Sequence, residues 1–149
     1  MKKPRILVAD DHPVILKAIC GLLEGRVGEV VGTVTDGQAL VEAAQRLEPD
    51  IILADISMPR LNGLEAARTL QYAVPQSKVI ILTSHHEAAY VTLAFEAGAR
   101  GYLLKRTFLH AELAQAVLHV LAGDRYIGQG VREERAFADK GESLIRYRL

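Results

Sequence analysis

The sequence is poor in the features that mark secreted, thiolate-rich or membrane proteins. It contains one cysteine, Cys20, which excludes an internal disulfide and a cysteine-based zinc site and suits the cytoplasm. Eighteen basic and eighteen acidic side chains cancel, so no overall field attracts the chain to nucleic acid or to a membrane surface. The N-terminal apolar run, residues 6–9, is too short for a secretory signal, and no stretch approaches the ~20 apolar residues of a membrane span. We therefore expect a cytoplasmic protein that binds neither nucleic acid nor membranes directly.

The 149 residues do contain an alternation of short apolar runs with segments of helical periodicity. The apolar runs are typical of strands buried on both faces of a parallel sheet. They lie at residues 5–9, 30–34, 51–54, 79–82 and 101–104. A segment with an apolar helical stripe follows each run. Five such alternations over residues 4–122 predict one α/β domain with a doubly wound, five-stranded parallel sheet and helices on both faces.

The pattern changes after Gly123. Residues 124–149 carry six basic and five acidic side chains, and we expect no strand there. Val131, Ala138 and Ile145 recur at heptad spacing, which is consistent with a short amphipathic helix that docks on the domain or on a second copy. A disordered tail is an equally good reading of this segment, residues 123–149.

Polar side chains follow or end four of the five predicted strands. They are Asp10 and Asp11, Asp55, Thr83 and Lys105. Because the strands of a parallel sheet point the same way, we expect these side chains to share one edge of the sheet. Three neighbouring carboxylates repel one another unless cations offset them. Oxygen ligands of this kind suit Mg²⁺, and Lys105 supplies a further positive charge.

This set of side chains matches the needs of phosphoryl transfer. A carboxylate such as Asp55 can act as the nucleophile and form an acyl phosphate. Mg²⁺ held by Asp11 and Asp55, with Asp10 orienting waters, would neutralise one phosphoryl oxygen, and Lys105 another. The Thr83 hydroxyl would hydrogen-bond a third oxygen. No residue is placed as an acid for the leaving group, which fits a donor that is already reactive, such as phosphohistidine.

At these positions the sequence resembles the receiver domains of two-component response regulators, and most closely the NarL/FixJ subfamily. The shared features are the acidic pair at 10–11 before His12-Pro13, Asp55 followed by Met58-Pro59 and Asn62-Gly63, Thr83, and the run from Ala97 to Lys105. The resemblance implies a flavodoxin-like fold with strand order 2-1-3-4-5. NarL/FixJ proteins usually continue into a helix-turn-helix domain, and no such motif occurs in the residues that remain here.

The resemblance also implies roles for single residues. Asp55 would accept the phosphoryl group from a sensor histidine kinase, with Thr83 and Lys105 contacting that group. The magnesium ligands would be Asp10, Asp11, Asp55 and the backbone carbonyl of Ser57. Thr83 and Tyr102 would form the switch, and Ser57 and His85 occupy positions that tune how fast the acyl phosphate hydrolyses. The output surface would be the helix–strand–helix face of residues 87–121, which could contact an output protein or a second copy.

Two other functions remain open at this point. A phosphorylation-independent adaptor would keep the fold and bind partners without phosphate. An aspartyl-phosphate phosphohydrolase would also use a strand-end Asp and Mg²⁺, but such enzymes usually carry an acid two residues after the nucleophile, where this chain has Ser57. We therefore expect self-catalysed phosphoryl transfer and dephosphorylation without further enzymatic turnover.

Overall fold

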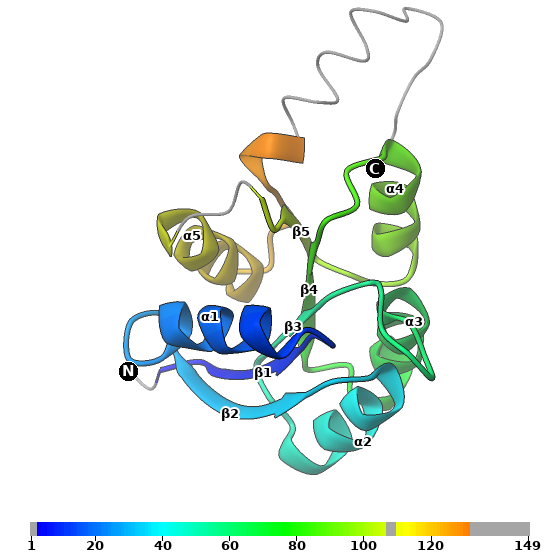
Figure 1. Ribbon diagram of the computed structural model, residues 1–149, viewed down its shortest axis with the longest axis horizontal. Helices are drawn as coiled ribbons and strands as arrows, with labels where there is room; N and C mark the ends of the chain where they lie inside the picture. The colour runs from blue at the N-terminus through cyan, green and yellow to red at the C-terminus, as the bar shows by residue number, and fades with distance from the viewer. Residues whose placement is uncertain (1–2, 107–109, 132–149) are drawn as a thin grey trace, which may run out of the picture.

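A parallel β-sheet layered between two groups of helices makes up the computed structural model, which describes residues 3–106 and 110–131 (Figure 1). The elements in chain order are β1 (Arg5–Ala9), α1 (Pro13–Leu23), β2 (Glu29–Val34), α2 (Gly37–Leu47), β3 (Ile51–Ala54), α3 (Gly63–Ala73), β4 (Lys78–Thr83), α4 (Ala88–Glu96), β5 (Gly101–Leu104), α5 (His110–Leu121) and β6 (Tyr126–Ile127). The five predicted alternations of strand and helix are therefore confirmed.

The strand order is β2-β1-β3-β4-β5-β6, and every neighbouring pair is parallel. The predicted order of the first five strands is confirmed, but the predicted total of five is wrong. The expectation that no strand follows Asp124 is also wrong, because Tyr126 and Ile127 pair with β5. Two residues are too few to show the periodicity that marks a strand in a sequence. The sheet thus takes in residues that lie beyond the predicted domain limit of 122.

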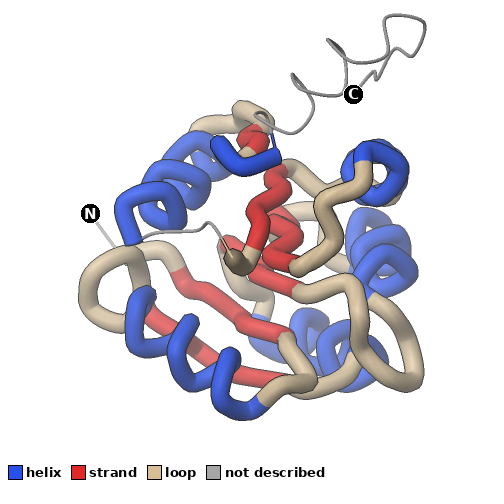
Figure 2. The backbone as a smooth tube through the Cα atoms, turned by 45° about the horizontal axis from the view of Figure 1, so that its top comes forward, coloured by secondary structure: helices blue, strands red, loops and turns tan. Residues whose placement is uncertain are grey.

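The two faces of the sheet are covered by different helices (Figure 2). Alternate residues of a strand point to opposite faces, so Ile6 and Val8 of β1 pack in one apolar cluster with residues of α1 and α5. Leu7 and Ala9 pack in a second cluster with residues of α2, α3 and α4. Because β1, β3, β4 and β5 are covered on both sides, they are apolar apart from the polar residues Arg5, Lys78 and Thr83 at strand ends.

Side-chain caps fix the start of two helices, α2 and α3, at the carboxyl edge of the sheet. The Asp36 carboxylate accepts a hydrogen bond from the Ala39 N–H at 2.7 Å and caps α2. Asn62 forms a reciprocal capping box with Glu65 at the start of α3. Gly63 follows directly, and a Cβ there would clash with the carbonyl oxygen of Asp55. The β3–α3 loop can therefore pass close to Asp55 only because residue 63 is glycine.

No helix in residues 3–106 and 110–131 is both long and apolar enough to cross a bilayer. The suggested tail helix can be followed only at its first residue: Val131 is fully buried in the cluster shared with α2, α3 and α4. Its other positions, Ala138 and Ile145, lie outside the described residues, as do residues 107–109 of the predicted output face.

Candidate functional site

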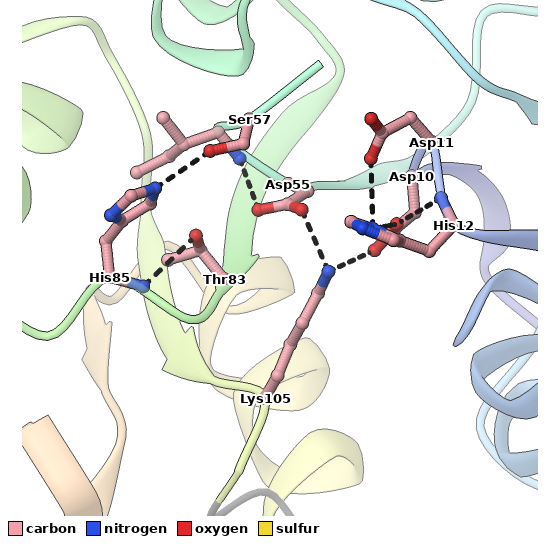
Figure 3. Close-up of polar contacts among 9 residues, drawn as sticks. Asp10, Asp11, His12, Asp55, Ser57, Thr83, His85 and Lys105 are labelled. Atoms are coloured by element: carbon pink, nitrogen blue, oxygen red, sulfur yellow. Dashed lines mark hydrogen bonds and ion pairs between the residues drawn. The ribbon is translucent and has the colours of Figure 1, made fainter. Parts of the chain in front are cut away.

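The predicted polar side chains meet at one edge of the sheet (Figure 3). The strand register places Ala9 beside Ala54, and Thr83 beside Leu104. The residues that end or follow these strands are therefore neighbours in space although they are far apart in the chain. The expectation that Asp10, Asp55, Thr83 and Lys105 share one edge is met by the geometry.

Lys105 forms the centre of the charged part of the site. Its ammonium lies 2.6 Å from Asp10 Oδ2 and 2.8 Å from Asp55 Oδ2. The two carboxylates are 1% and 5% exposed, and the Lys105 side chain is 12% exposed. Burial alone would lower the pKa of Lys105, but the hydrogen bonds to Asp10 and Asp55 and the charges of both carboxylates raise it above its ordinary value. The lysine is therefore held in its charged form between two carboxylates.

The Asp55 side chain is fixed from two sides. Its Oδ1 accepts a hydrogen bond from the Ile56 N–H at 2.7 Å, while its Oδ2 faces Lys105. The residue is 4% exposed. These contacts hold the Asp55 carboxylate in one orientation, and a carboxylate placed in this way can act as a nucleophile.

Asp55 also belongs to a cluster of side chains that could bind a metal ion. Asp10, Asp11, His12 and Asp55 each offer one ligand atom, and these atoms all lie within 4.8 Å of one another. His12 Nδ1 is 3.2 Å from Asp10 Oδ1 and 3.0 Å from Asp11 Oδ1. The His12 backbone N–H also donates to Asp10 Oδ1, at 2.9 Å.

These donors fit a divalent cation. Asp11 Oδ1 is shielded from solvent, and within the described part of the chain it takes part in no hydrogen bond, although His12 Nδ1 is near. A shielded carboxylate oxygen that lacks a well-formed hydrogen bond is costly, and an ion bound by oxygen ligands would satisfy it. The residues predicted as magnesium ligands, Asp10, Asp11 and Asp55, are therefore suitably arranged. The predicted part of the Ser57 backbone carbonyl stays a prediction.

His12 was not predicted as part of the site. In the sequence it counted only as one of the positions shared with receiver domains, and in the structure it is the N-cap residue of α1, without a side-chain cap. The signal that could have identified it is its adjacency to the acidic pair, since a residue directly after a strand end stays at the same edge of the sheet.

A polar bridge crosses the opposite side of Asp55. Ser57 Oγ lies 2.8 Å from His85 Nε2, which links the β3–α3 loop to the β4–α4 loop (Figure 3). The His85 ring stacks on Tyr90 with 4.3 Å between ring centroids. The His85 N–H donates to Thr83 Oγ1 at 3.4 Å. The two positions expected to tune hydrolysis are thus in direct contact, and one of them contacts the predicted switch residue Thr83.

Tyr102 lies inward from this bridge. The residue is fully buried, and its hydroxyl donates to the His85 carbonyl oxygen at 2.6 Å. Burial raises the pKa of the Tyr102 phenol, and the carboxylates of Glu87 and Asp55 raise it further. Thr83, His85 and Tyr102 therefore form one connected path from the site to β5.

Comparison with known proteins identifies the family. A family model described as the response regulator receiver domain matches residues 6–118. The chain belongs to this family. Response regulator GacA of Pseudomonas viridiflava is 38% identical over 133 residues, which are 89% of this chain and 62% of that protein. Transcriptional regulatory protein DegU of Brevibacillus brevis is 40% identical over 126 residues, which are 84% of this chain and 53% of that protein. The chain thus spans less than two thirds of the length of these relatives.

Solved structures agree with this assignment. A two-component response regulator of the LuxR family from Aurantimonas sp. SI85-9A1 superposes with a TM-score of 0.85 at 33% identity, over 95% of this chain and all of that one. The receiver domain of the putative response regulator NarL from Mycobacterium tuberculosis gives 0.77 at 32% identity, over 83% of this chain and 99% of that one. The resemblance to NarL-type receivers seen in the sequence is therefore confirmed.

Proposed function

We propose that this receiver domain accepts a phosphoryl group on Asp55 from the phosphohistidine of a sensor histidine kinase in a Mg²⁺-dependent reaction. The observation that carries the proposal is the placement of Asp55: a buried carboxylate held 2.8 Å from the Lys105 ammonium and beside the ligand atoms of Asp10 and Asp11. No enzymatic turnover beyond self-catalysed transfer and dephosphorylation is proposed.

In the transfer step, an oxygen of the Asp55 carboxylate forms a bond to phosphorus while the bond from phosphorus to the donor nitrogen breaks. The donor imidazole keeps the electron pair of that bond. Lys105 stays charged and offsets the negative charge on the phosphoryl oxygens. Asp10, Asp11, Asp55 and the Ser57 carbonyl would hold Mg²⁺, which when bound neutralises a further phosphoryl oxygen.

Switching would follow from the path through Thr83. A phosphoryl oxygen near Thr83 would accept a hydrogen bond from its hydroxyl, and movement of Thr83 toward that oxygen would break the 3.4 Å hydrogen bond that Thr83 Oγ1 accepts from the backbone N–H of His85. A shift of His85 moves the carbonyl oxygen that accepts the Tyr102 hydroxyl. The face of residues 87–121, which carries Tyr102, would change its affinity for an output protein or a second copy.

The bridge between Ser57 and His85 supports a part in phosphoryl lifetime. It joins the two loops beside Asp55, where an acyl phosphate would form. Ser57 also stands where a phosphohydrolase would carry its acid, and a serine hydroxyl cannot act as an acid near neutral pH. This favours a phosphorylation switch over an enzyme that turns over phosphate esters.

The test is incorporation of acid-labile phosphate from acetyl phosphate with Mg²⁺, followed by intact-protein mass spectrometry. Asp55→Asn should abolish incorporation. Asp50→Asn is the matched control, because Asp50 precedes β3 as Asp55 follows it, and this variant should incorporate phosphate like the unchanged protein. Incorporation that survives Asp55→Asn contradicts the proposal. A protein that takes up no phosphate, and whose partner binding ignores phosphodonors, would instead be an adaptor.

A further inference from the structure

Residues 124–131, here called the strap, form a segment beyond the part of the chain that matches the receiver family, which ends at residue 118. The strap runs along the outer edge of β5 and contains β6. The Tyr126 N–H donates to Arg100 O at 2.9 Å, and the Gly128 N–H donates to Tyr102 O at 2.8 Å. The strap is therefore hydrogen-bonded to the main chain of the predicted switch residue.

Side chains anchor the strap to both helices that flank β5. One carboxylate oxygen of Glu112 in α5 accepts the Gln129 N–H at 2.9 Å and lies 3.4 Å from the Tyr126 hydroxyl. On the other side, the Arg125 guanidinium lies 5.3 Å from the centroid of the Phe95 ring in α4. The strap thus contacts α4, β5 and α5, which are the three elements of the predicted output face.

The strap also supports Tyr102 through side-chain packing. Ile127 is the register partner of Tyr102, and in a parallel pair such residues project from the same face of the sheet. Ile127 packs against the apolar cluster that contains Tyr102, and the fully buried Val131 belongs to that cluster. Gly128 permits this approach, since a Cβ there would already lie 3.0 Å from Leu103 Cδ2.

We infer that the strap is a positioning element for the switch. When docked, it favours the buried orientation of the Tyr102 ring, in which the hydroxyl donates to the His85 carbonyl oxygen. The inference rests on the proposed function. Phosphorylation of Asp55 would favour the same buried orientation of Tyr102. Docking of the strap and phosphorylation then stabilise each other, because coupling between two sites is reciprocal. A phosphoryl mimic at Asp55 therefore makes the strap harder to open.

The test measures hydrogen exchange at the backbone amides of Tyr126 and Gly128, with NMR on the full chain as the readout. Beryllofluoride with Mg²⁺ should slow exchange at both amides about fivefold or more, within the usual range of coupling between sites. The Glu29 amide, which bonds Pro4 O at the opposite edge of the sheet, is the internal control and should not respond. Asp55→Asn should remove the response at the strap.

Glu112→Ala tests the anchor. Loss of hydrogen bonds to a carboxylate should speed exchange at both strap amides about tenfold, with or without the mimic. Gln115→Ala is the matched control, an exposed residue of the same helix, and should leave both rates unchanged.

The ¹⁹F NMR signal of bound beryllofluoride separates the two ways to fail. Bound beryllofluoride with unchanged exchange at Tyr126 and Gly128 overturns the coupling and leaves the proposed function standing. Failure of beryllofluoride to bind overturns both. Unchanged exchange in Glu112→Ala overturns the assignment of Glu112 as the anchor.

Discussion

Replacing Lys105 by methionine should destabilise the protein strongly, and Mg²⁺ should restore much of the loss. The Lys105 ammonium lies 2.6 Å from Asp10 and 2.8 Å from Asp55, and both carboxylates are buried. Methionine fills the space of the aliphatic stem but carries no charge. The variant therefore leaves two buried carboxylates without the cation that offsets them.

The magnitude follows from the geometry. The ligand atoms of Asp10 and Asp55 lie no more than 4.8 Å apart. At an effective dielectric constant of about 20, two like charges at that distance repel by about 3.5 kcal/mol. Breaking a buried ion pair by removing one partner costs about 3–5 kcal/mol in general. We therefore expect Lys105→Met to lower the free energy of unfolding by about 3–5 kcal/mol in a metal-free buffer.

Urea denaturation followed by circular dichroism measures this loss, with EDTA and with millimolar Mg²⁺. Mg²⁺ should stabilise Lys105→Met more than the unchanged protein, because the variant has the larger excess of negative charge. Lys17→Met, which removes an exposed lysine of α1, is the control and should change stability by less than about 0.5 kcal/mol. A loss below about 1 kcal/mol for Lys105→Met, or equal stabilisation of both proteins by Mg²⁺, would refute the reasoning.

Three further predictions concern glycine packing, pH and metal binding. In urea denaturation, Gly63→Ala should lower the free energy of unfolding by about 3 kcal/mol or more, because the new Cβ clashes with the Asp55 carbonyl oxygen. Gly21→Ala is the control: the space around Gly21 in α1 is open, so this change should raise the free energy of unfolding by about 0.5–1 kcal/mol. Equal effects of the two changes would contradict this reasoning. The pKa values of Tyr102 and Lys105 are both raised in the folded state, so the stability that these groups contribute is present below about pH 10 and is lost as the pH rises further. Tyr102→Phe should therefore reduce the loss of stability at alkaline pH. An unchanged slope of unfolding free energy against pH would contradict the assignment. His12→Asn should tighten Mg²⁺ binding about two- to fivefold in calorimetry, because the imidazole lies 3.0 Å from Asp11 Oδ1 and competes with Mg²⁺ for that oxygen. Weaker binding would mean that His12 is itself a ligand.

Much of the fold was predictable because the strands β1, β3, β4 and β5 are buried on both faces. These strands are apolar except at their ends, as at Arg5, and the limits Arg5–Ala9, Ile51–Ala54 and Gly101–Leu104 coincide with the predicted runs. The edge strand β2, predicted at residues 30–34, begins one residue earlier at Glu29, and its register with β1 shifts between Ile6 and Leu7. Strand β6 was missed because its pairing uses backbone groups that every sequence possesses.

The candidate site was predictable to the extent that strand ends reveal it. Asp10, Asp55, Thr83 and Lys105 were assembled from one rule, that parallel strands share an edge. The bridge between Ser57 and His85 could not be foreseen as a contact, because it depends on the paths of two loops. The same is true of the hydrogen bond from Tyr102 to His85 O, since its acceptor is a backbone atom.

The chain as a whole has no net charge, but the site has a local excess of negative charge, and this excess indicates the order in which the cation and the phosphoryl donor bind. Asp10, Asp11 and Asp55 carry three negative charges, and the Lys105 ammonium offsets one of them. A phosphoryl donor is itself an anion, so its approach to two uncompensated carboxylates is repelled in a site of low dielectric. A divalent cation held by these three carboxylates would remove this excess. Binding of the cation should therefore precede and enable binding of the donor, and the rate of phosphoryl uptake should rise with Mg²⁺ concentration and level off when the acidic cluster is saturated.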